Sequence, residues 1–373
     1  MNEIKDTEEL IEEKVEVKKP SANLVSGRGL DVGTGFLCMA QMNSNGDMVT
    51  KSVRDSFLEL TPSNKMAKKI MKKGLVKAGV NFLEDSEKFF VLGEDSLSQS
   101  VERSMTTKRP MSKGVISPTE ANALPMFKAL LKELLGTPLT QNEKILYSVP
   151  ASPADAPFDV VYHENVIEAI LKDLGYEGSS INEAHAIVFS ELDSDDDSYT
   201  GLTLSFGAGM TNVCVANMAD IVTTFSVSKG GDYIDLNSAI SLGFDPKDDR
   251  ASEITPSLIT YIKEQGVDIR NPGTDRTHIA IASYYKALIS YVVKSIVQEI
   301  DSLESKPRFL EPIKVVVSGG TSKAIGFLEI FKEEFKKQSD KLPFEVKDVV
   351  HARDPLTAVA EGSLTALLVE YED

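Results

Sequence analysis

Three glycine turns, each following a run of strand-forming residues, have the clearest capacity for chemistry in this sequence. They are DVGTG at residues 31–35, SFGAGMT at 205–211 and VVVSGGTSK at 315–323. Glycine lets backbone N–H groups approach an anion closely, and a helix that begins at such a turn favours negative charge or a polar ring edge. A single glycine turn could equally well reflect the geometry of a β-hairpin, which favours glycine without any ligand. Three together predict a site for a chain of phosphates and an attached nucleoside.

Asp31 stands at the start of the first turn. Mg²⁺ binds carboxylates and usually keeps several of its waters, so Asp31 is a candidate to hold a hydrated magnesium ion beside the phosphates. The simpler alternative is an aspartate that caps the turn. The third turn differs from the others because it passes from a strand directly into a predicted helix, TSKAIGFLEIFKEEFKKQ. We expect this third turn to hold the nucleoside end of a ligand.

The elements that must position these turns form an internal repeat. The pattern predicts a strand, a glycine turn and a hairpin in each of two segments, residues 27–53 and 201–228. The first arm of each hairpin holds one cysteine, Cys38 or Cys214. Helical segments and further strands follow each copy. The pattern predicts an α/β protein of two domains, each with a mixed β-sheet flanked by helices, and a cleft between them. The expected boundaries are a charged tail at 1–25, a first domain at 26–180 with a small subdomain at about 54–115, and a second domain at 181–373.

Composition and charge exclude several classes of function for this protein. The 373 residues are 42% hydrophobic, enough for large cores, and the formal net charge of −17 argues against nucleic acid or an anionic membrane as a direct partner. Both cysteines lie in apolar runs and predict buried thiols in a reducing compartment. The first residues lack the apolar run of a signal peptide, so we expect a cytoplasmic protein. The sequence has no HExxH, CxxC or GxxxxGK[ST] pattern, and we predict neither a structural metal site nor a P-loop.

A lysine-rich segment occupies residues 64–79. Met66, Ile70 and Leu75 lie near helical spacing, so we expect one apolar face to pack while the lysines stay in water. A solvated face is the simpler interpretation. The alternative is a contact with an acidic surface of a second copy, which would produce head-to-tail association and open filaments. The lysines are Lys65, Lys68, Lys69, Lys72, Lys73 and Lys77.

The three turns occur in the order found in a known superfamily. LDVGTG resembles the first phosphate motif of the actin, heat-shock chaperone and sugar-kinase ATPases, LSFGAGMTNV resembles the second, and VVVSGGTSKAIGF resembles the adenosine motif. INEAHAIVFSEL is similar to the connecting helix of these proteins. The segments VLGEDSL, TKRPMSKGVISPTE and GGDYID resemble prokaryotic actins of the MreB, MamK and ParM type. The resemblance implies two actin-like domains with a nucleotide in the cleft between them.

The resemblance also implies ligands and residue roles. The ligands would be ATP or ADP with Mg²⁺. Asp31 would hold the magnesium through water and share the catalytic role with Glu183, which would orient the attacking water. An exposed carboxylate at the start of a helix is the alternative for Glu183. The remaining nucleotide-binding residues are expected to be Gly33, Thr34, Gly35, Phe36, Ser205, Gly207, Ala208, Gly209, Met210, Thr211, Gly231, Asp232, Gly319, Gly320, Thr321, Ser322 and Lys323.

Three positions depart from the usual motifs of the superfamily. Ser205 stands where an aspartate is usual, Met210 where a threonine is usual, and Phe36 where the MreB branch has a small polar residue. A serine can hydrogen-bond a metal-bound water, but it adds no charge near the metal. We therefore expect nucleotide binding with slow or altered hydrolysis.

The leading functional hypothesis from the resemblance is a cytoskeletal ATP-binding protein that polymerises with copies of itself in a nucleotide-dependent way. An adaptor protein would be a further partner, and direct contact with a membrane or nucleic acid is not expected. A non-polymerising chaperone-like or scaffold ATPase of the same fold is the first alternative. A small-molecule kinase is the second. A kinase would need a catalytic aspartate for a substrate hydroxyl, and the sequence offers no clear candidate.

Overall fold

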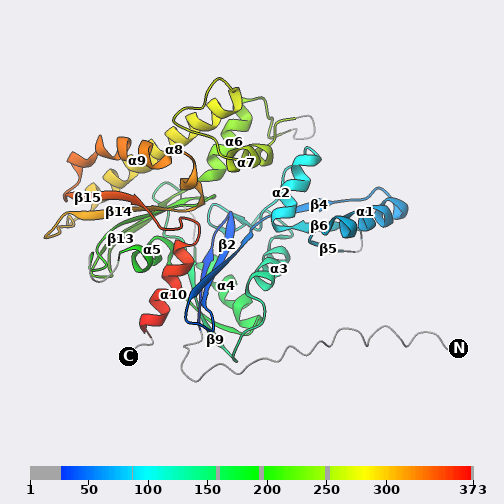
Figure 1. Ribbon diagram of the computed structural model, residues 1–373, viewed down its shortest axis with the longest axis horizontal. Helices are drawn as coiled ribbons and strands as arrows, with labels where there is room; N and C mark the ends of the chain where they lie inside the picture. The colour runs from blue at the N-terminus through cyan, green and yellow to red at the C-terminus, as the bar shows by residue number, and fades with distance from the viewer. Residues whose placement is uncertain (1–26, 86, 157–159, 193–196, 248–252, 371–373) are drawn as a thin grey trace.

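Two mixed β-sheets form the body of the protein in the computed structural model (Figure 1). It describes residues 27–85, 87–156, 160–192, 197–247 and 253–370, and the expected tail at 1–25 lies outside them. The first sheet has the order β10-β9-β1-β2-β3, with β1 (Gly27–Val32), β2 (Phe36–Met42), β3 (Met48–Arg54), β9 (Glu143–Val149) and β10 (Tyr176–Asn182). The second has the order β13-β12-β11-β14-β15, with β11 (Gly201–Phe206), β12 (Thr211–Asn217), β13 (Asp220–Val227), β14 (Ile313–Ser318) and β15 (Val346–His351).

The two sheets share one pairing pattern. In each, the three strands of the repeat form an antiparallel meander. The first strand of each meander also pairs in parallel with a strand from later in the chain, β9 or β14, and β10 or β15 adds a second parallel pair. The predicted repeat and the mixed sheets are confirmed. Both cysteines lie in the second strand of their meander and are buried free thiols, as predicted.

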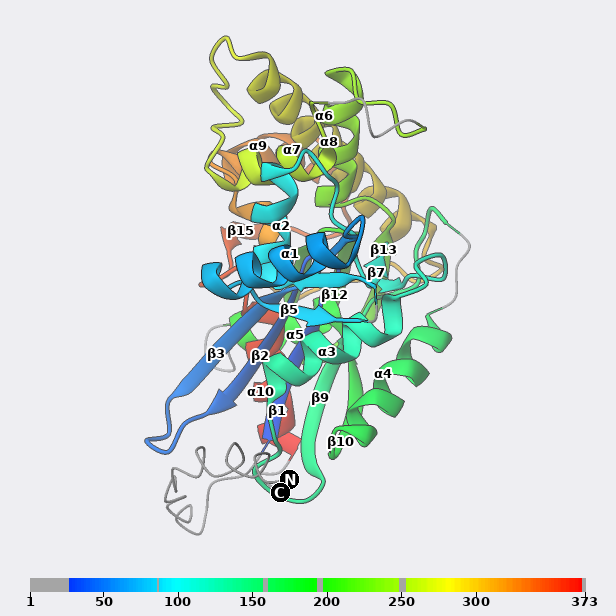
Figure 2. The same ribbon diagram turned by 90° about the vertical axis from the view of Figure 1, so that its right-hand side faces the viewer.

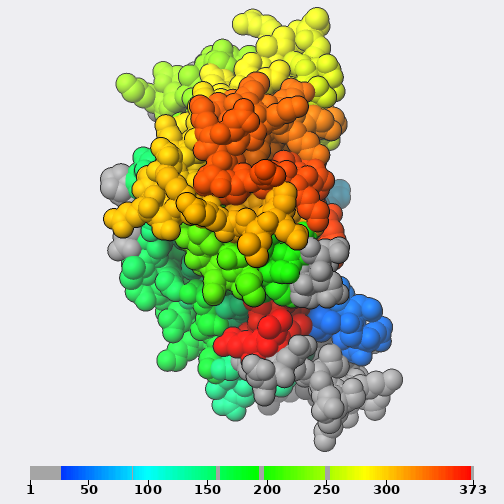
Figure 3. All heavy atoms as spheres, turned by 90° about the vertical axis from the view of Figure 1, so that its left-hand side faces the viewer, coloured from blue at the N-terminus to red at the C-terminus, as the bar shows by residue number. Residues whose placement is uncertain are grey.

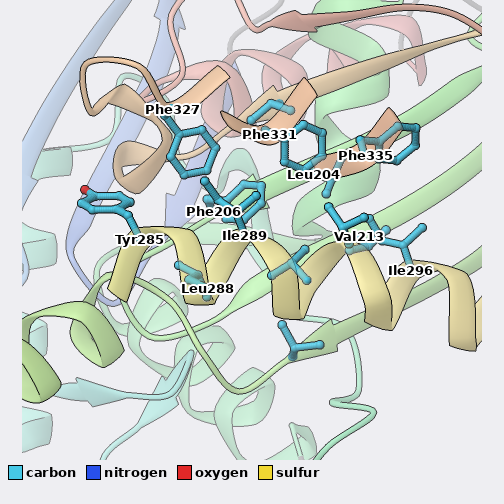
Figure 4. Close-up of a cluster of buried hydrophobic side chains, with 14 of the residues drawn as sticks. Leu204, Phe206, Val213, Tyr285, Leu288, Ile289, Ile296, Phe327, Phe331 and Phe335 are labelled. Atoms are coloured by element: carbon cyan, nitrogen blue, oxygen red, sulfur yellow. The ribbon is translucent and has the colours of Figure 1, made fainter. Parts of the chain in front are cut away.

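Helices bury the outer faces of both sheets and define two domains. The first domain is built on the first sheet, with α3 (Ala123–Leu135) and α4 (Val161–Asp173) contributing to its apolar core. The second domain carries α6 (Gly231–Ser241), α7 (Pro256–Glu264), α8 (Arg276–Ser302), α9 (Phe327–Lys336) and the short turn η3 (Ser339–Lys341). Its core joins α8 and α9 to the sheet, and Phe206 of β11 packs edge-on against Phe327 of α9 (Figure 4).

Two further helices, α5 (Glu183–Glu191) and α10 (Ala358–Glu370), pack against each other and connect the two sheets. α10 also packs on β1, and α5 on β11. Glycine makes these contacts close: a Cβ on Gly362 would lie 1.8 Å from the carbonyl oxygen of Ala186, and one on Gly29 would lie 2.0 Å from that of Ala360. The red surface of α10 emerges below the second domain in Figure 3. None of the described helices is long and apolar enough to cross a membrane.

A small subdomain follows β3 and projects from the first domain in Figure 1, and it faces the viewer in Figure 2. It has a three-stranded sheet of β4 (Phe57–Leu60), β6 (Phe89–Leu92) and β5 (Phe82–Glu84), the helices α1 (Lys65–Ala78) and α2 (Gly93–Glu102), and the hairpin of β7 (Met111–Ser112) and β8 (Val115–Ile116). Asn64 caps α1 by accepting a hydrogen bond from the Ala67 N–H, and Gly79 ends it in the left-handed conformation. α2 reaches α7 of the second domain.

The expected packing face of α1 is partly wrong. Leu75 is buried as predicted, but Met66 and Ile70 are 69% and 63% exposed. At about 100° per residue, Leu75 lies on the opposite side of the helix from Met66. Met71 packs beside Leu75 in the subdomain core instead.

The third glycine turn does not lead directly into an α-helix, in contrast to the sequence prediction. β14 is followed by the 3-10 turn η2 (Gly320–Lys323), and α9 begins only at Phe327. Ala324 is extended with ψ of 139°, and Gly326 has a positive φ of 86°. These two residues separate the turn from α9, so the N-terminus of that helix is not part of the turn.

Candidate functional site

A cavity of about 380 Å³ lies between the two domains, and all three glycine turns contribute to its wall. The first two turns face each other closely. A Cβ on Gly35 would lie 2.9 Å from the Ala208 Cβ, and a Cβ on Gly209 would lie 2.6 Å from the Thr34 Oγ1. Side chains at either glycine would therefore push the turns apart.

Backbone donors at these turns are available for an anion. Within the described part of the chain, the N–H groups of Thr34, Gly35, Ala208 and Gly209 have no hydrogen-bond acceptor. By contrast, the Gly207 N–H is used in its own hairpin and donates to the Met210 carbonyl. Unpaired N–H groups from two turns at one cavity form the kind of concave donor surface that binds phosphate.

Two buried carboxylates, Asp31 and Glu183, line the same cavity. Asp31 ends β1 beside the first turn, and its Oδ1 accepts a 2.9 Å hydrogen bond from the Ser148 hydroxyl. Burial raises the pKa of Asp31 to about 7, although the bond from Ser148 acts in the opposite direction. Burial, and then the nearby charge of Asp31, raise the pKa of Glu183 to about 8. Each carboxylate therefore makes ionisation of the other more costly.

Glu183 is held rigidly by two donors. The Ser205 hydroxyl donates to its Oε1 at 2.6 Å, and the Asn212 amide donates to its Oε2 at 2.7 Å. Asn212 is itself fixed, because its Oδ1 accepts from the Ala151 N–H. Glu183 begins α5, whose cap is Asn182, but it is only 9% exposed. The alternative of an exposed helix-start carboxylate is therefore wrong.

The third turn closes the far side of the cavity. Gly319 has a positive φ of 89°, and a Cβ there would lie 2.3 Å from the Phe206 carbonyl oxygen, so only glycine fits. The Thr321 hydroxyl donates to the Gly207 carbonyl oxygen at 2.8 Å and ties this turn to the second one. Gly320 and Lys323 line the cavity beside them.

Nearly all the residues predicted for the site meet at this cavity. The lining includes Asp31, Gly33, Thr34, Gly35, Phe36, Glu183, Ser205, Gly207, Ala208, Gly209, Met210, Gly231, Asp232, Gly319, Gly320, Thr321 and Lys323. Two predicted residues do not line it. The Thr211 hydroxyl donates to the Lys229 carbonyl oxygen, and the Ser322 hydroxyl donates to that of Gly319.

Apart from the start of α6, sequence reasoning missed one side of the cavity, which α6, α7 and α8 supply. Lys263 of α7 donates to Asp235 of α6 at 2.7 Å, and the Thr260 hydroxyl donates to the other carboxylate oxygen of Asp235. Burial raises the pKa of Asp235, and Lys263 lowers it. Glu264 and Tyr285 complete this side. Asp235 ends the segment GGDYID, whose resemblance indicated a relationship but no role for this residue, and the segments that hold Lys263, Glu264 and Tyr285 carry no distinctive motif.

Two arginines were also missed. Arg54 ends β3 and Arg109 precedes β7, and both line the cavity opposite α6 and α7. Arg109 belongs to the segment TKRPMSKGVISPTE, whose resemblance to the MreB and MamK proteins indicated a relationship but not a role.

Solved structures with the same architecture define the class of protein. The chain is similar to the "MamK double helical filament", at 17% identity and a TM-score of 0.63, over 92% of this chain and 98% of that one. It is similar to MreB 5 of Spiroplasma citri bound to AMPPNP, at 14% identity and a TM-score of 0.61, over 93% and 97%. The ethanolamine utilization protein EutJ from Carboxydothermus hydrogenoformans follows at 14% identity and a TM-score of 0.51, over 91% and 89%. The protein has the two-domain actin-like ATPase fold, as predicted.

The particular family follows from the sequence. The family model of Volactin matches residues 27–367, which is nearly all of the described chain, and the protein belongs to the Volactin family. A search of curated proteins finds no match.

Proposed function

We propose that this protein is an ATP-binding cytoskeletal actin that assembles head-to-tail into filaments in a nucleotide-dependent way, in the cytoplasm. The observation that carries the proposal is the pair of glycine turns with unpaired N–H groups, facing each other above Asp31 and Glu183 in one cavity. Such an arrangement suits the phosphates of a nucleotide. The similarity to MamK, described as a double helical filament, supports the assembly part.

The carboxylate pair fits a magnesium ion. Asp31 and Glu183 raise each other's cost of ionisation in a buried site, and a cation would remove that cost. The described residues contain no group of three or more histidine, cysteine, aspartate or glutamate side chains that would hold a metal alone. Water and phosphate oxygens would therefore complete the coordination, as is usual for Mg²⁺. When bound, the ion supplies positive charge that neutralises the phosphates.

The chain's own residues would position the reacting water. Ser205 and Asn212 fix both oxygens of Glu183, so its carboxylate can accept a hydrogen bond from a water and hold a proton at Oε1 or Oε2. The unpaired N–H groups of the two turns would bind the phosphate oxygens on which negative charge develops. ATP bound to both domains would favour the closed conformation that assembles.

Hydrolysis is expected to be slow, because Ser205 contributes a hydroxyl where a carboxylate is usual in the superfamily. Phosphate release by pure protein with Mg²⁺ and ATP tests this proposal. Ser205→Asp is expected to increase turnover by about tenfold in the presence of Mg²⁺, because it restores the carboxylate that is usual near the metal, although it gives up the hydrogen bond that Ser205 donates to Glu183. A wild-type rate that already equals that of S205D would show that Ser205 does not limit hydrolysis.

Pelleting combined with electron microscopy tests the assembly proposal. The full chain is compared with ATP, with ADP and without nucleotide, in magnesium buffer. Filaments that depend on nucleotide are the expected result. A protein that binds ATP but stays monomeric at every salt concentration would favour the non-polymerising ATPase, and transfer of phosphate to a small acceptor would favour a kinase.

A further inference from the structure

Two arginines of the first domain reach across the cavity to carboxylates of the second. The Arg54 guanidinium forms a two-pronged ion pair with Glu264 at the end of α7, with Nη1–Oε1 and Nη2–Oε2 distances of 3.2 and 2.5 Å. The Arg109 Nη1 lies 2.7 Å from the Oδ1 of Asp232 in the first turn of α6. All four side chains line the cavity. We refer to the pairs Arg54–Glu264 and Arg109–Asp232 as the cross-cleft clamp.

Arg54 is fixed before it reaches the second domain. Its Nε donates to Glu94 of α2 at 2.7 Å, its Cζ lies 4.5 Å from the centre of the Phe36 ring, and the residue is only 6% exposed. A guanidinium that is already stacked and partly dehydrated loses little freedom when it pairs, so its forked bond to Glu264 is stronger than a surface ion pair. This contact gives a physical role to Phe36.

Arg109 joins the clamp directly to the phosphate-binding turns. Besides Asp232, its Nη1 approaches the Thr34 carbonyl oxygen of the first turn at 3.4 Å. The backbone N–H of Asp232 donates to the Ala208 carbonyl oxygen of the second turn at 2.8 Å. A movement that separates the two turns therefore also strains the Arg109–Asp232 pair.

A third contact lies at the same edge of the cleft. The Thr107 N–H donates to the Ser257 hydroxyl at 2.9 Å, at the start of α7. The helices α5 and α10 connect the two sheets separately from these contacts. Because the three contacts all link the small-subdomain side to α6 and α7, opening of the cleft at this edge must break them.

We propose that the cross-cleft clamp gates nucleotide exchange: a nucleoside triphosphate or diphosphate leaves the cavity only after Arg54–Glu264 and Arg109–Asp232 have separated. Arg54 and Arg109 are thus positioning residues that set the residence time of the nucleotide. The proposal rests on the proposed nucleotide-binding function, and it adds a specific control of release.

The first test measures dissociation of a fluorescent ATP analogue from the full chain, by stopped flow with excess unlabelled ATP. Arg54→Ala and Arg109→Ala are each expected to increase the dissociation rate by about tenfold or more, because truncating one partner of a desolvated charge pair acts mainly on dissociation. Glu264→Gln and Asp232→Asn remove the partner charges with little change of shape and should act in the same direction. The control is Arg103→Ala, because Arg103 directly follows α2 and its guanidinium pairs with Glu102 and Gln99 of that helix.

A double-mutant cycle separates the clamp from a general loss of packing. If Arg109 and Asp232 act as a pair, R109A and D232A combined will increase dissociation no more than either single change. Two results would overturn the proposal. One is nucleotide dissociation rates of the clamp variants that lie within twofold of the R103A rate. The other is strictly additive effects of R109A and D232A on the dissociation free energy barrier in the cycle.

Hydrogen–deuterium exchange of the nucleotide-free protein tests the clamp independently of nucleotide binding. R54A and R109A are expected to increase exchange in α2 and α7, whereas R103A should leave α7 unchanged. If wild-type protein binds no ATP but the exchange result holds, the proposed function fails and the clamp stands as a contact only. If ATP binds and neither dissociation nor exchange changes, the gate is wrong while the nucleotide site stands.

Discussion

The carboxylates of Asp31 and Glu183 link the site to the stability of the fold. Their pKa values rise from the ordinary 3.8 and 4.5 to about 7 and about 8, chiefly through burial. Between about pH 4 and pH 8 the folded protein therefore holds protons that the unfolded chain has released. Stability of the nucleotide-free protein must decrease as pH rises through this range, and a bound cation would oppose the decrease.

Neutral substitutes at these two positions give the first prediction. Asp31→Asn and Glu183→Gln are expected to stabilise the nucleotide-free protein at pH 8 by roughly 1–3 kcal/mol, with a smaller gain at pH 5. Both changes should also abolish any effect of Mg²⁺ on ATP binding or hydrolysis. Urea unfolding at the two pH values measures the gain, with Glu304→Gln as an exposed control. Equal gains at both pH values would contradict the assigned pKa shifts.

The residues of the site divide into those that sequence could predict and those that it could not. The glycine turns are local patterns, so their meeting at one cavity was predictable from consecutive residues and from the order of the turns along the chain. Arg54 and Glu264 are separated by 210 positions, and only folding brings them together. Ser205 and Phe36 were recognised as departures from a motif, and their partners in space, Glu183 and Arg54, explain what each one contacts.

At the scale of elements, the contact between α5 and α10 leaves no room for a larger residue at its glycine. α10 lies against α5 and β1, and Gly362 has no room for a side chain beside the Ala186 carbonyl oxygen. Because the interior is close-packed, an added methyl group there must displace one helix. That displacement would move Glu183 at the start of α5, so stability and site geometry are coupled through this contact.

Gly362→Ala is the prediction for this contact. We expect it to lower the free energy of unfolding by about 3 kcal/mol or more, because overpacking at a helix backbone has no flexible side chain to give way. Gly74→Ala is the matched control, since a Cβ on Gly74 in α1 would meet nothing within 4 Å. Alanine in that exposed helix should stabilise it by up to about 1 kcal/mol. Chemical denaturation of both variants measures the contrast, and G362A as stable as wild type would disprove the close contact.

Element boundaries show where local pattern and tertiary structure disagree. The repeated meander was predictable because strand alternation of apolar and polar residues and glycine turns are patterns of consecutive residues. The third turn was not, because Ala324 and Gly326 interrupt a segment whose composition otherwise suits a continuous helix. Likewise, the apolar spacing in α1 suggested one face, whereas the small sheet beneath selects Leu75 and Met71.

The whole molecule is strongly acidic, with a net charge of −17, yet one helix carries a basic stripe. Lys68 and Lys72 of α1 pair with Glu84 in the same subdomain. Four other lysines recur every fourth position on the exposed surface of α1 and form no ion pair within the described part of the chain: Lys65, Lys69, Lys73 and Lys77. Met66 and Ile70 are exposed among them. Positive charge beside apolar surface on an acidic protein suits contact with a second, acidic copy.

Charge reversal on this stripe gives the prediction for the assembly as a whole. Lys69→Glu combined with Lys73→Glu should raise the concentration needed for filament formation by about tenfold or more, because like charges then face each other across the contact. Wild-type assembly should weaken as salt increases, since these charges are exposed and screened. The control is Lys132→Glu with Lys172→Glu, which makes the same charge change on exposed positions of α3 and α4. Pelleting across a concentration series measures the assembly of both double variants. The comparison requires that each variant binds ATP like the wild type. If both double variants assemble like the wild type, α1 is a solvated face, and the head-to-tail contact must use another surface of the two domains.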